Sequence, residues 1–317
     1  MEGKLIEERF AKLEQSLADA EMNYNECLDT VWMLLATMLI FFMQAGFTLI
    51  EAGSVGVKAA QHIVAKTLCV VTVGFLCWYA LGYPLAYGLD LSKFPGHSGF
   101  ALIGVYRSRG ALRIWFQQAA LCATSVAVVS GAMAERTMVK GFLAYAAIMA
   151  SLIYPIVVHW SWSGIGIFDY EEGGQRQSVI SGPPLVDFAG SGVVHLVGGV
   201  AALCGAAAVG PRDGRFGAAS TGNVEITATQ FDAKSMPFIV VGTFFLWFGW
   251  FGFNAGSVSN MHTLAAAQTA GVVSVNTALA PCVSGLVVFA FRRQMQSPAV
   301  GDIRGFCNGI LAGLVAV

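Results

Sequence analysis

Asp187-Phe188-Ala189-Gly190-Ser191-Gly192-Val193-Val194-His195 places an acid and a histidine eight residues apart in a segment that is otherwise as apolar as a membrane span. Ionisable side chains at the depth of a bilayer are costly, and their presence there points to a function. Eight residues make slightly more than two helical turns, so a helix beginning at Asp187 would carry both side chains along one side. The acid would then lie at the positive end of the helix dipole.

The composition of the whole chain is that of a membrane protein. Of its 317 residues, 56% are hydrophobic and 12% are charged, and the mean hydropathy is +0.65. A soluble domain has about twice this charged fraction. The net charge of −1 gives no reason to expect a nucleic-acid partner. The seven cysteines form no CxxC pair and no metal-ligand spacing, so we expect neither a metal nor a cofactor.

Eight apolar segments are long enough to cross about 30 Å of hydrocarbon. They cover residues 31–53, 67–88, 114–134, 140–159, 187–209, 236–256, 263–291 and 303 to the end. From Gly309 the eighth runs to Val317 with no stop signal, no flanking charge and no aromatic anchor, so we expect it to be cut short and the chain to end inside a larger protein. The predicted fold class is therefore an all-α polytopic membrane protein, with its membrane domain at residues 31–317.

The basic residues of the connecting loops predict the orientation of the spans. If the N-terminus lies outside, ten lysines and arginines fall in inner loops and five in outer loops. The inner set is Lys58, Lys66, Arg136, Lys140, Arg212, Arg215, Lys234, Arg292, Arg293 and Arg304, and the outer set is Lys93, Arg107, Arg109, Arg113 and Arg176. We therefore expect a multi-pass protein of the cell (inner or plasma) membrane with its N-terminus outside.

Residues 1–30 form a separate, extra-membrane segment with a short heptad pattern, which we call the head. Its apolar residues recur at alternating spacings of four and three, with charged residues between them. They are Ile6, Phe10, Leu13, Leu17, Ala20 and Tyr24. Two structures fit this pattern: an amphipathic helix lying on the membrane or on its own domain, and a small oligomerising coiled coil.

A polytopic bundle with buried polar side chains is a transporter, a channel, a receptor or a membrane enzyme. The sequence has no HExxH motif and no nucleophile elbow, so we do not expect an enzyme. Its aromatic residues fit two roles. Trp160 and most of the aromatic run at 247–253 are typical of an interfacial belt. A Trp face near a buried carboxylate would also attract a small cation, with a gain of about 2 kcal/mol once the site is desolvated.

Five motifs follow one another between residue 31 and the end of the chain. They are Met43-Gln44-Ala45-Gly46-Phe47 with Glu51-Ala52-Gly53, Gly131 through Arg136, Asp187 through His195, Trp247 through Ser257, and Asn308 through Val315. Together they resemble the ammonium transporter (Amt/MEP/Rh) family, in its Amt branch. The resemblance implies a homotrimer with one pore per subunit and eleven spans, arranged as two inverted repeats of five helices. About eight of these spans would lie in this chain.

The resemblance also implies roles for individual residues. Trp162 and Ser257 would form an outer site that recruits the ammonium ion, and Asp187 would stay ionised and stabilise the cation without touching it. Phe116 would belong to the outer aromatic gate and Phe253 would be its inner member. His195 would be the first of two pore-lining histidines that exchange protons with the substrate. The implied function is transport: NH4+ is recruited by cation–π contact and deprotonated for passage through an apolar pore.

Two departures from the family pattern favour an alternative. Ala120 stands where the resemblance places the second ring of the stacked gate, and the second histidine would lie beyond Val317. The same fold could therefore serve as an ammonium sensor that signals to a fused domain beyond residue 317. A transporter would instead be expected to meet a cytoplasmic regulator of the PII type.

Overall fold

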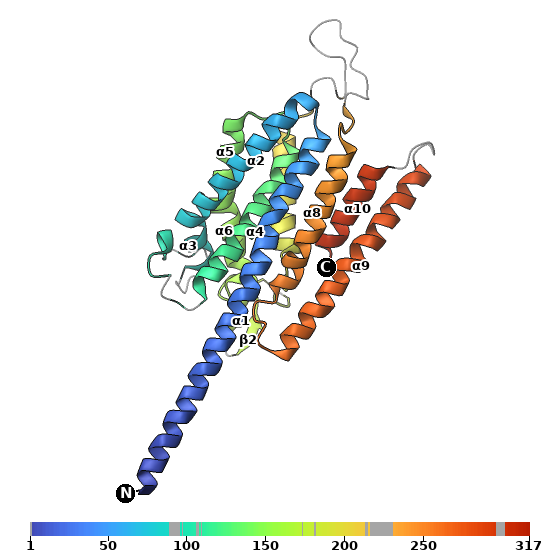
Figure 1. The fold of residues 1–317 in the computed structure, drawn as a ribbon. Helices are drawn as coiled ribbons and strands as arrows, with labels where there is room; N and C mark the ends of the chain where they lie inside the picture. Colours follow the sequence, from blue (N-terminus) through green and yellow to red (C-terminus); the bar gives the residue numbers. More distant parts are fainter. Residues whose placement is uncertain are drawn as a thin grey trace, which may run out of the picture.

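The computed structural model describes residues 2–88, 96, 98–105, 108, 110–172, 174–180, 182–212, 215, 231–295 and 302–317 (Figure 1). Three residues used in the orientation argument, Lys93, Arg107 and Arg109, lie outside this set. The described helices are α1 (Glu2–Ser54), α2 (Val57–Cys77), α3 (Tyr83–Tyr87), α4 (Ala111–Ala132), α5 (Val139–Ile148), α6 (Tyr154–Trp162), α7 (Val197–Val209), α8 (Met236–Asn254), α9 (Leu264–Met295) and α10 (Ile303–Val315).

Short non-α turns connect or extend several of these helices. The π-helical turns are η1 (Trp78–Gly82), η4 (Met149–Ile153) and η5 (Ser191–Leu196), and the 3-10 turns are η2 (Phe100–Leu102) and η7 (Ala255–Ser257). Two short strands, β1 (Tyr170–Glu172) and β2 (Gln175–Gln177), pair in antiparallel fashion.

The predicted membrane spans are confirmed as helices. Within the described residues, seven helical runs are long and apolar enough to cross a membrane, and α10 is a shorter apolar helix. Each predicted segment falls on one of these eight runs. The second is longer than expected, because it begins at Val57 rather than at residue 67. The hairpin of β1 and β2 is the one departure from an all-α architecture within the described residues.

The head and the first span form a single helix. α1 runs without a break from Glu2 to Ser54, and its first part extends straight beyond the rest of the bundle (Figure 1). We call the end of the bundle from which the head projects the head end, and the opposite end the loop end. Because the chain alternates direction, α4, α7 and α9 begin at the head end, whereas α2, α8 and α10 begin at the loop end.

α1 packs closely against α8 through small residues. A Cβ atom added at Gly46 would lie 2.9 Å from the carbonyl oxygen of Gly242, and one added at Gly249 would lie 2.2 Å from Cγ of Met43. Neither contact is sterically allowed, so glycine is required at both positions. In a membrane, close contact of this kind replaces the hydrophobic driving force for helix association.

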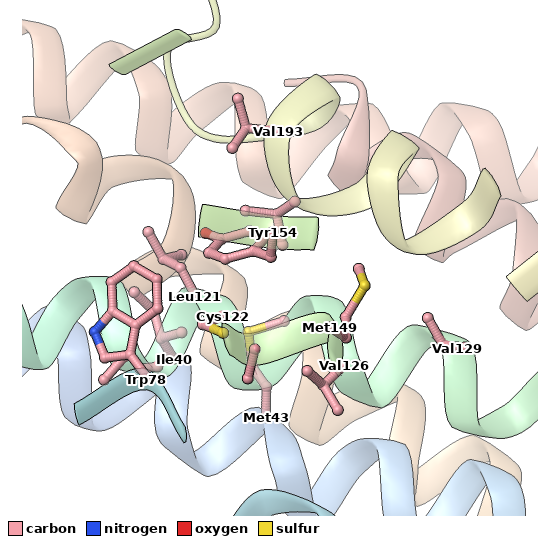
Figure 2. Close-up of a cluster of buried hydrophobic side chains, with 14 of the residues drawn as sticks. Ile40, Met43, Trp78, Leu121, Cys122, Val126, Val129, Met149, Tyr154 and Val193 are labelled. Atoms are coloured by element: carbon pink, nitrogen blue, oxygen red, sulfur yellow. The ribbon is translucent and has the colours of Figure 1, made fainter. Parts of the chain in front are cut away.

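The largest core cluster lies where α4 passes between α1, η1 and α6. Figure 2 shows Trp78 and Tyr154 packed near Leu121, Cys122 and Met43. All five side chains are buried. Cys122 acts here as a small core residue, as its position in an apolar run suggests.

A buried ion pair connects α1 to α2 near the loop end. Lys66 Nζ lies 2.5 Å from Glu51 Oε2, and the side chains are 2% and 8% exposed. Ser130 Oγ of α4 donates a hydrogen bond to the other carboxylate oxygen of Glu51. The ammonium group of Lys66 also lies 4.5 Å from the centre of the Phe142 ring. This network joins four helices, so Glu51 and Lys66 form an ion pair at the contact between helices.

Glu51→Gln is expected to lower the free energy of unfolding by about 3 kcal/mol, because it leaves the Lys66 charge buried without a counter-charge. The measurement is the apparent melting temperature of the purified protein in detergent. The double variant Glu51→Gln/Lys66→Met serves as the control, since it removes both charges and should recover most of the loss. A Glu51→Gln protein that melts like the original would contradict this role.

Candidate functional site

The side chain of Asp187 caps the start of the η5–α7 helix. Its Oδ1 accepts a hydrogen bond from the Gly190 N–H at 2.9 Å, and its Oδ2 accepts bonds from Gly192 and Val193 at 3.1 and 2.7 Å. Both carboxylate oxygens are therefore used as acceptors. This carboxylate therefore caps the helix, and the cap is more extensive than a single hydrogen bond would be.

The turn after Asp187 begins with a π-helical bulge that depends on Gly190. Gly190 has φ +98°, a left-handed conformation that a side chain would strain, and an added Cβ would lie 2.7 Å from Val194. Its carbonyl oxygen accepts bonds from the N–H groups of both Val194 and His195, at 2.9 and 3.0 Å. Bulges of this type are frequent at functional sites. Here the bulge places His195 one turn inside the bundle.

Trp162 is tied directly to the Asp187 loop. Its indole Nε1 donates to the backbone oxygen of Asp187 at 2.8 Å, so the last turn of α6 and the start of η5 are held together. The intervening loop is held by Arg176, whose Nε donates to Asp169 Oδ1 at 2.8 Å. Hydrogen bonding to Asp169 raises the pKa of the Arg176 guanidinium, so this link is charged at any physiological pH. Arg176 also donates to the Leu185 carbonyl at 3.3 Å, two residues before Asp187.

Ser257 lies in η7, the turn that follows α8. Its hydroxyl donates to the Phe253 carbonyl at 2.8 Å, which leaves the lone pairs of Oγ available to accept a hydrogen bond. Gln117 of α4 fixes the same turn, because its Nε2 donates to the Gly256 carbonyl at 3.0 Å. Asn254 holds the end of α8 from the other side through Thr277 Oγ1 and the Leu314 carbonyl, at 3.1 and 3.2 Å.

Trp162, Asp187 and Ser257 line a single cavity of about 310 Å³ at the head end. The other lining residues come from α1, α3, α4 and the loops around the site. They are Met33, Tyr87, Ile114, Gln117, Gln118, Leu121, Phe188 and Ser259. Three residues far apart in the sequence are thus brought together by α6, η5 and η7. The cavity combines an indole, a carboxylate and a hydroxyl, a set suited to a small cation that donates hydrogen bonds.

Phe116 and Ala120 are not among the residues that line this cavity. Ala120 is fully buried in the helix core, and α4 instead presents Gln117, Gln118 and Leu121 to the cavity. Consecutive residues on a helix point about 100° apart, so Leu121 faces the cavity where its neighbour Ala120 does not. Sequence reasoning missed Leu121. Its spacing of four from Gln117 could have identified it.

His195 lies deeper, against two aromatic rings of α8. Its ring centre is 5.3 Å from that of Trp250 in a stacked arrangement and 5.1 Å from that of Phe253 in a tilted one. Both aromatic side chains are almost fully buried, at 2% and 1% exposed. The interpretation of Trp250 as part of an interfacial belt is therefore wrong, because its ring packs on the histidine in the core. The spacing of three between residues 250 and 253 places both rings on one face of α8.

Three buried polar atoms of the residues around the cavity and His195 have no hydrogen-bond partner among the residues that the structure describes. They are Gln118 Oε1, His195 Nε2 and Trp250 Nε1. Buried polar groups are nearly always paired, so such atoms call for an explanation. Gln118 also lines the cavity, and sequence reasoning did not identify it.

The polar residues at the loop end form structural contacts. Glu135 Oε1 accepts from the Gly56 N–H at 2.7 Å, and its Oε2 lies 2.7 Å from Arg212 Nη1. Arg136 Nη1 donates to the Gly210 carbonyl at 2.5 Å. Glu135 is thus ion-paired with Arg212 at this surface. Within the described residues, no group of three or more His, Cys, Asp or Glu side chains is placed to hold a metal ion.

Comparison with known proteins gives consistent relatives. The profile of the Ammonium Transporter Family matches residues 31–317. Ammonium transporter Amt2 of Archaeoglobus fulgidus is 36% identical over 290 residues, which are 92% of this chain and 59% of the relative. Ammonium transporter 1 member 3 of Solanum lycopersicum is 35% identical over 306 residues, which are 94% of this chain and 63% of the relative. The chain thus spans about three fifths of the length of these relatives.

Solved structures agree with the sequence relatives. A sensor Amt protein matches with a TM-score of 0.80 and 28% identity, over 93% of this chain and 69% of the other. Mep2 of Candida albicans matches with a TM-score of 0.74 and 28% identity, over 90% of this chain and 59% of the other. The family profile covers every predicted span. This chain therefore belongs to the ammonium transporter family.

Proposed function

We propose that the protein transports ammonium across a cell membrane, recruiting NH4+ in the head-end cavity and deprotonating it before passage through an apolar pore. The observation that carries this proposal is the convergence of Trp162, Asp187 and Ser257 on one cavity. The names of the sequence relatives support transport rather than an enzymatic activity.

Each residue of the recruitment site has a different role in binding the cation. The Trp162 ring offers a π face to the cation, and Ser257 Oγ accepts an N–H bond. Asp187 acts through its field rather than by contact, because both of its oxygens already accept backbone N–H bonds. Its charge stabilises a cation nearby without giving the cation a tight binding site.

The barrier below the cavity is apolar. Leu121 and Phe253 are 4% and 1% exposed, and both belong to the main core cluster. We assign to Leu121 the position in the outer gate that the family resemblance gave to the second ring. A branched aliphatic side chain excludes water as a ring does, so the absence of a ring at Ala120 does not open the pore.

In this proposal His195 accepts the proton from ammonium and passes it on toward the loop end, so ammonia and its proton cross separately and net charge moves. Ammonium and potassium have similar size and charge, so an electrostatic well alone does not separate them. Deprotonation separates them, because potassium has no proton to give. Neutral ammonia crosses an apolar pore at low cost, whereas a desolvated cation does not. Imidazole is the side chain best suited to this exchange near neutral pH, and the free Nε2 of His195 is the atom available for it.

Trp162→Leu is expected to raise the ammonium concentration for half-maximal response about 30-fold, from the loss of ~2 kcal/mol of cation–π attraction. The measurement is the response of protein reconstituted in liposomes to a series of ammonium concentrations. Ser257→Ala should shift the same curve in the same direction by a smaller factor.

Trp160→Leu is the matched control for this prediction. Trp160 lies on the same helix, and its ring packs edge-to-face on Phe168 with ring centres 5.9 Å apart, away from the cavity. Its replacement should leave the half-maximal concentration unchanged. If both variants shift the curve equally, the loss reflects a disturbed α6 and Trp162 is not part of the binding site.

Assembly and orientation follow the same proposal. We assign the protein to the cell membrane, as a homotrimer with one pore per subunit and the head end outside. The ten basic residues that the sequence assigns to inner loops, against five assigned to outer loops, support this orientation. On this assignment the cavity opens to the outside, and a regulator of the PII type would meet the loop end.

A second candidate is an ammonium sensor that binds the ion with the same fold. The observation that favours it is the TM-score of 0.80 to a sensor Amt protein. A pulse of ammonium on reconstituted membranes separates the two functions. A transporter gives a current that lasts as long as the gradient, whereas a sensor gives a brief charge displacement that saturates as its sites fill.

A further inference from the structure

The head helix exposes a continuous apolar seam that nothing in its own chain covers among the described residues. Phe10 and Leu17 are each 62% exposed, and the other seam residues Ile6, Leu13 and Tyr24 are more than half exposed. An isolated helix of this length is only marginally stable in water. A free-standing helix with such a seam therefore needs a partner.

The base of the head is fixed in orientation by an ion pair and by hydrogen bonds to Asp29. Arg113 of α4 pairs with Glu26 and also donates to Thr30 Oγ1 at 3.0 Å. Asp29 accepts from the backbone N–H groups of Met261 and His262, at 2.6 and 3.2 Å. These contacts hold α1 where it leaves the bundle. The head can neither fold down onto the bundle nor lie flat on a membrane without breaking the helix.

The seam faces away from these contacts and continues along the span. On a helix with 100° per residue, Glu26 and Asp29 lie on the side opposite Tyr24, and the buried face of the span follows them. Below Tyr24, the exposed stripe runs on through Leu28, Val31, Leu35, Met38 and Phe42. The seam in water and the uncovered stripe in the membrane are thus one surface. A partner helix that packs against the stripe within the membrane would therefore also contact the seam above it.

The charges beside the seam fit a second copy of the same helix. With Phe10, Leu17 and Tyr24 at heptad position a and Ile6, Leu13 and Ala20 at position d, Arg9 falls at position g and Glu14 at position e. In a parallel coiled coil, g and e residues five apart in sequence face each other on neighbouring chains and form salt bridges. Arg9 of one copy would therefore meet Glu14 of the next. Copies inserted in the same orientation are necessarily parallel.

We infer that the heads of neighbouring copies wind into a parallel coiled coil above the membrane domains. The number of strands rests on the proposed homotrimer. Position a lacks the β-branched residues that favour two strands, which fits more than two copies. Because the membrane domains hold the heads close together, even a short seam associates at the resulting high effective concentration. The coiled coil of heads would then hold the subunits together on the side of the assembly where the cavity opens.

Cysteine cross-linking of the whole protein in membranes tests this inference. In a Cys27→Ser background, Leu13→Cys places a thiol in the seam, and mild oxidation should give a covalent dimer, since three equivalent thiols form one disulfide. Gln15→Cys is the matched control, two residues away on the opposite face, where it loses only an exposed hydrogen bond to Asp19. We expect at least tenfold less dimer from it. Equal dimer from both positions, or none from Leu13→Cys, would overturn the coiled coil.

Charge reversal provides a second test that does not depend on the seam residues. Added to Leu13→Cys, Arg9→Glu should reduce the covalent dimer severalfold by facing two glutamates across the seam. Arg9→Glu/Glu14→Arg should restore it, because the pair is re-formed in reverse. The two positions do not face each other within one helix, so restoration requires contact between copies. Failure of the double variant to recover cross-linking contradicts the assigned register.

Light scattering gives the mass of the purified assembly. Together with the cross-linking, this mass tests the coiled coil independently of the proposed function. A trimer with no seam cross-link overturns the coiled coil and leaves the transporter proposal standing. Cross-linked heads on an assembly of another size support the coiled coil and contradict the homotrimer.

Discussion

Asp187→Ala is expected to abolish ammonium transport and to prevent correct assembly of the site. The substitution removes the acceptor for three backbone N–H groups, those of Gly190, Gly192 and Val193. Each N–H left without a partner costs about 1–3 kcal/mol, so the loss is on the order of 5 kcal/mol at the turn that positions His195. Trp162 is affected as well, since it donates to the Asp187 carbonyl. Thermal unfolding and ammonium-driven current together measure the effect.

Asp187→Asn removes the charge and keeps part of the helix cap. The separation of the two roles is incomplete, because the cap is weakened as well. Both carboxylate oxygens accept hydrogen bonds, and an amide keeps only one acceptor oxygen. We expect a folded protein with a lowered melting temperature and a current reduced about 100-fold, because two unit charges about 6 Å apart interact by roughly 3 kcal/mol at an effective dielectric constant of 20.

Asp302→Asn is the matched control. Asp302 caps α10 through the Gly305 N–H at 2.8 Å, and its other oxygen lies 2.8 Å from Arg292 Nε, so it loses the same kind of contacts at the loop end. It should lower the melting temperature and leave the current of the folded protein intact. If Asp187→Asn also retains full current, the carboxylate has a purely structural role.

His195→Phe is expected to lower the ammonium-driven current about 1000-fold while the protein stays folded. Phenylalanine fills a similar space and keeps the ring packing on Trp250 and Phe253, but it carries no proton. Loss of a positioned acid–base group commonly costs 10²–10⁴ in rate, and the estimate takes the middle of that range. The melting temperature and the apparent affinity of the outer cavity should stay close to those of the unchanged protein.

His62→Phe makes the same chemical change on the exposed surface of α2 and serves as the control. It should leave the current unchanged. A His195→Phe protein that carries the full current would remove the histidine from the transport path and leave it as a packing residue.

The membrane architecture could be predicted from the sequence because a span must be apolar over its whole length. That requirement identified all eight apolar helical runs, including the short α10. It does not show where a helix continues into water. No glycine or proline interrupts α1 between the head and the span, and the helix crosses the change in composition without a break. The hairpin of β1 and β2 was also missed, since it depends on the contact between Asp169 and Arg176.

The candidate site shows what sequence motifs can and cannot supply. The family resemblance identified Trp162, Asp187 and Ser257, and these residues do meet at one cavity. It also assigned Phe116 and Ala120 to the gate. α4 presents Leu121 to the cavity instead of these two residues, and a shift of one position turns a side chain by about 100°. The interface between α8 and η5 makes Trp250 a core residue. That contact is tertiary, and no local pattern distinguishes it from a tryptophan at the membrane surface.

Selectivity between ammonium and potassium is the most direct test of the proposed transport. Protein reconstituted in liposomes on a solid support would receive equal pulses of ammonium and of potassium while the current is recorded. The cavity recruits the cation, and below it ammonia and its proton cross separately, the proton by way of His195. This account predicts a sustained current with ammonium and none with potassium. Equal currents from the two ions, or only a brief signal with ammonium, would contradict it.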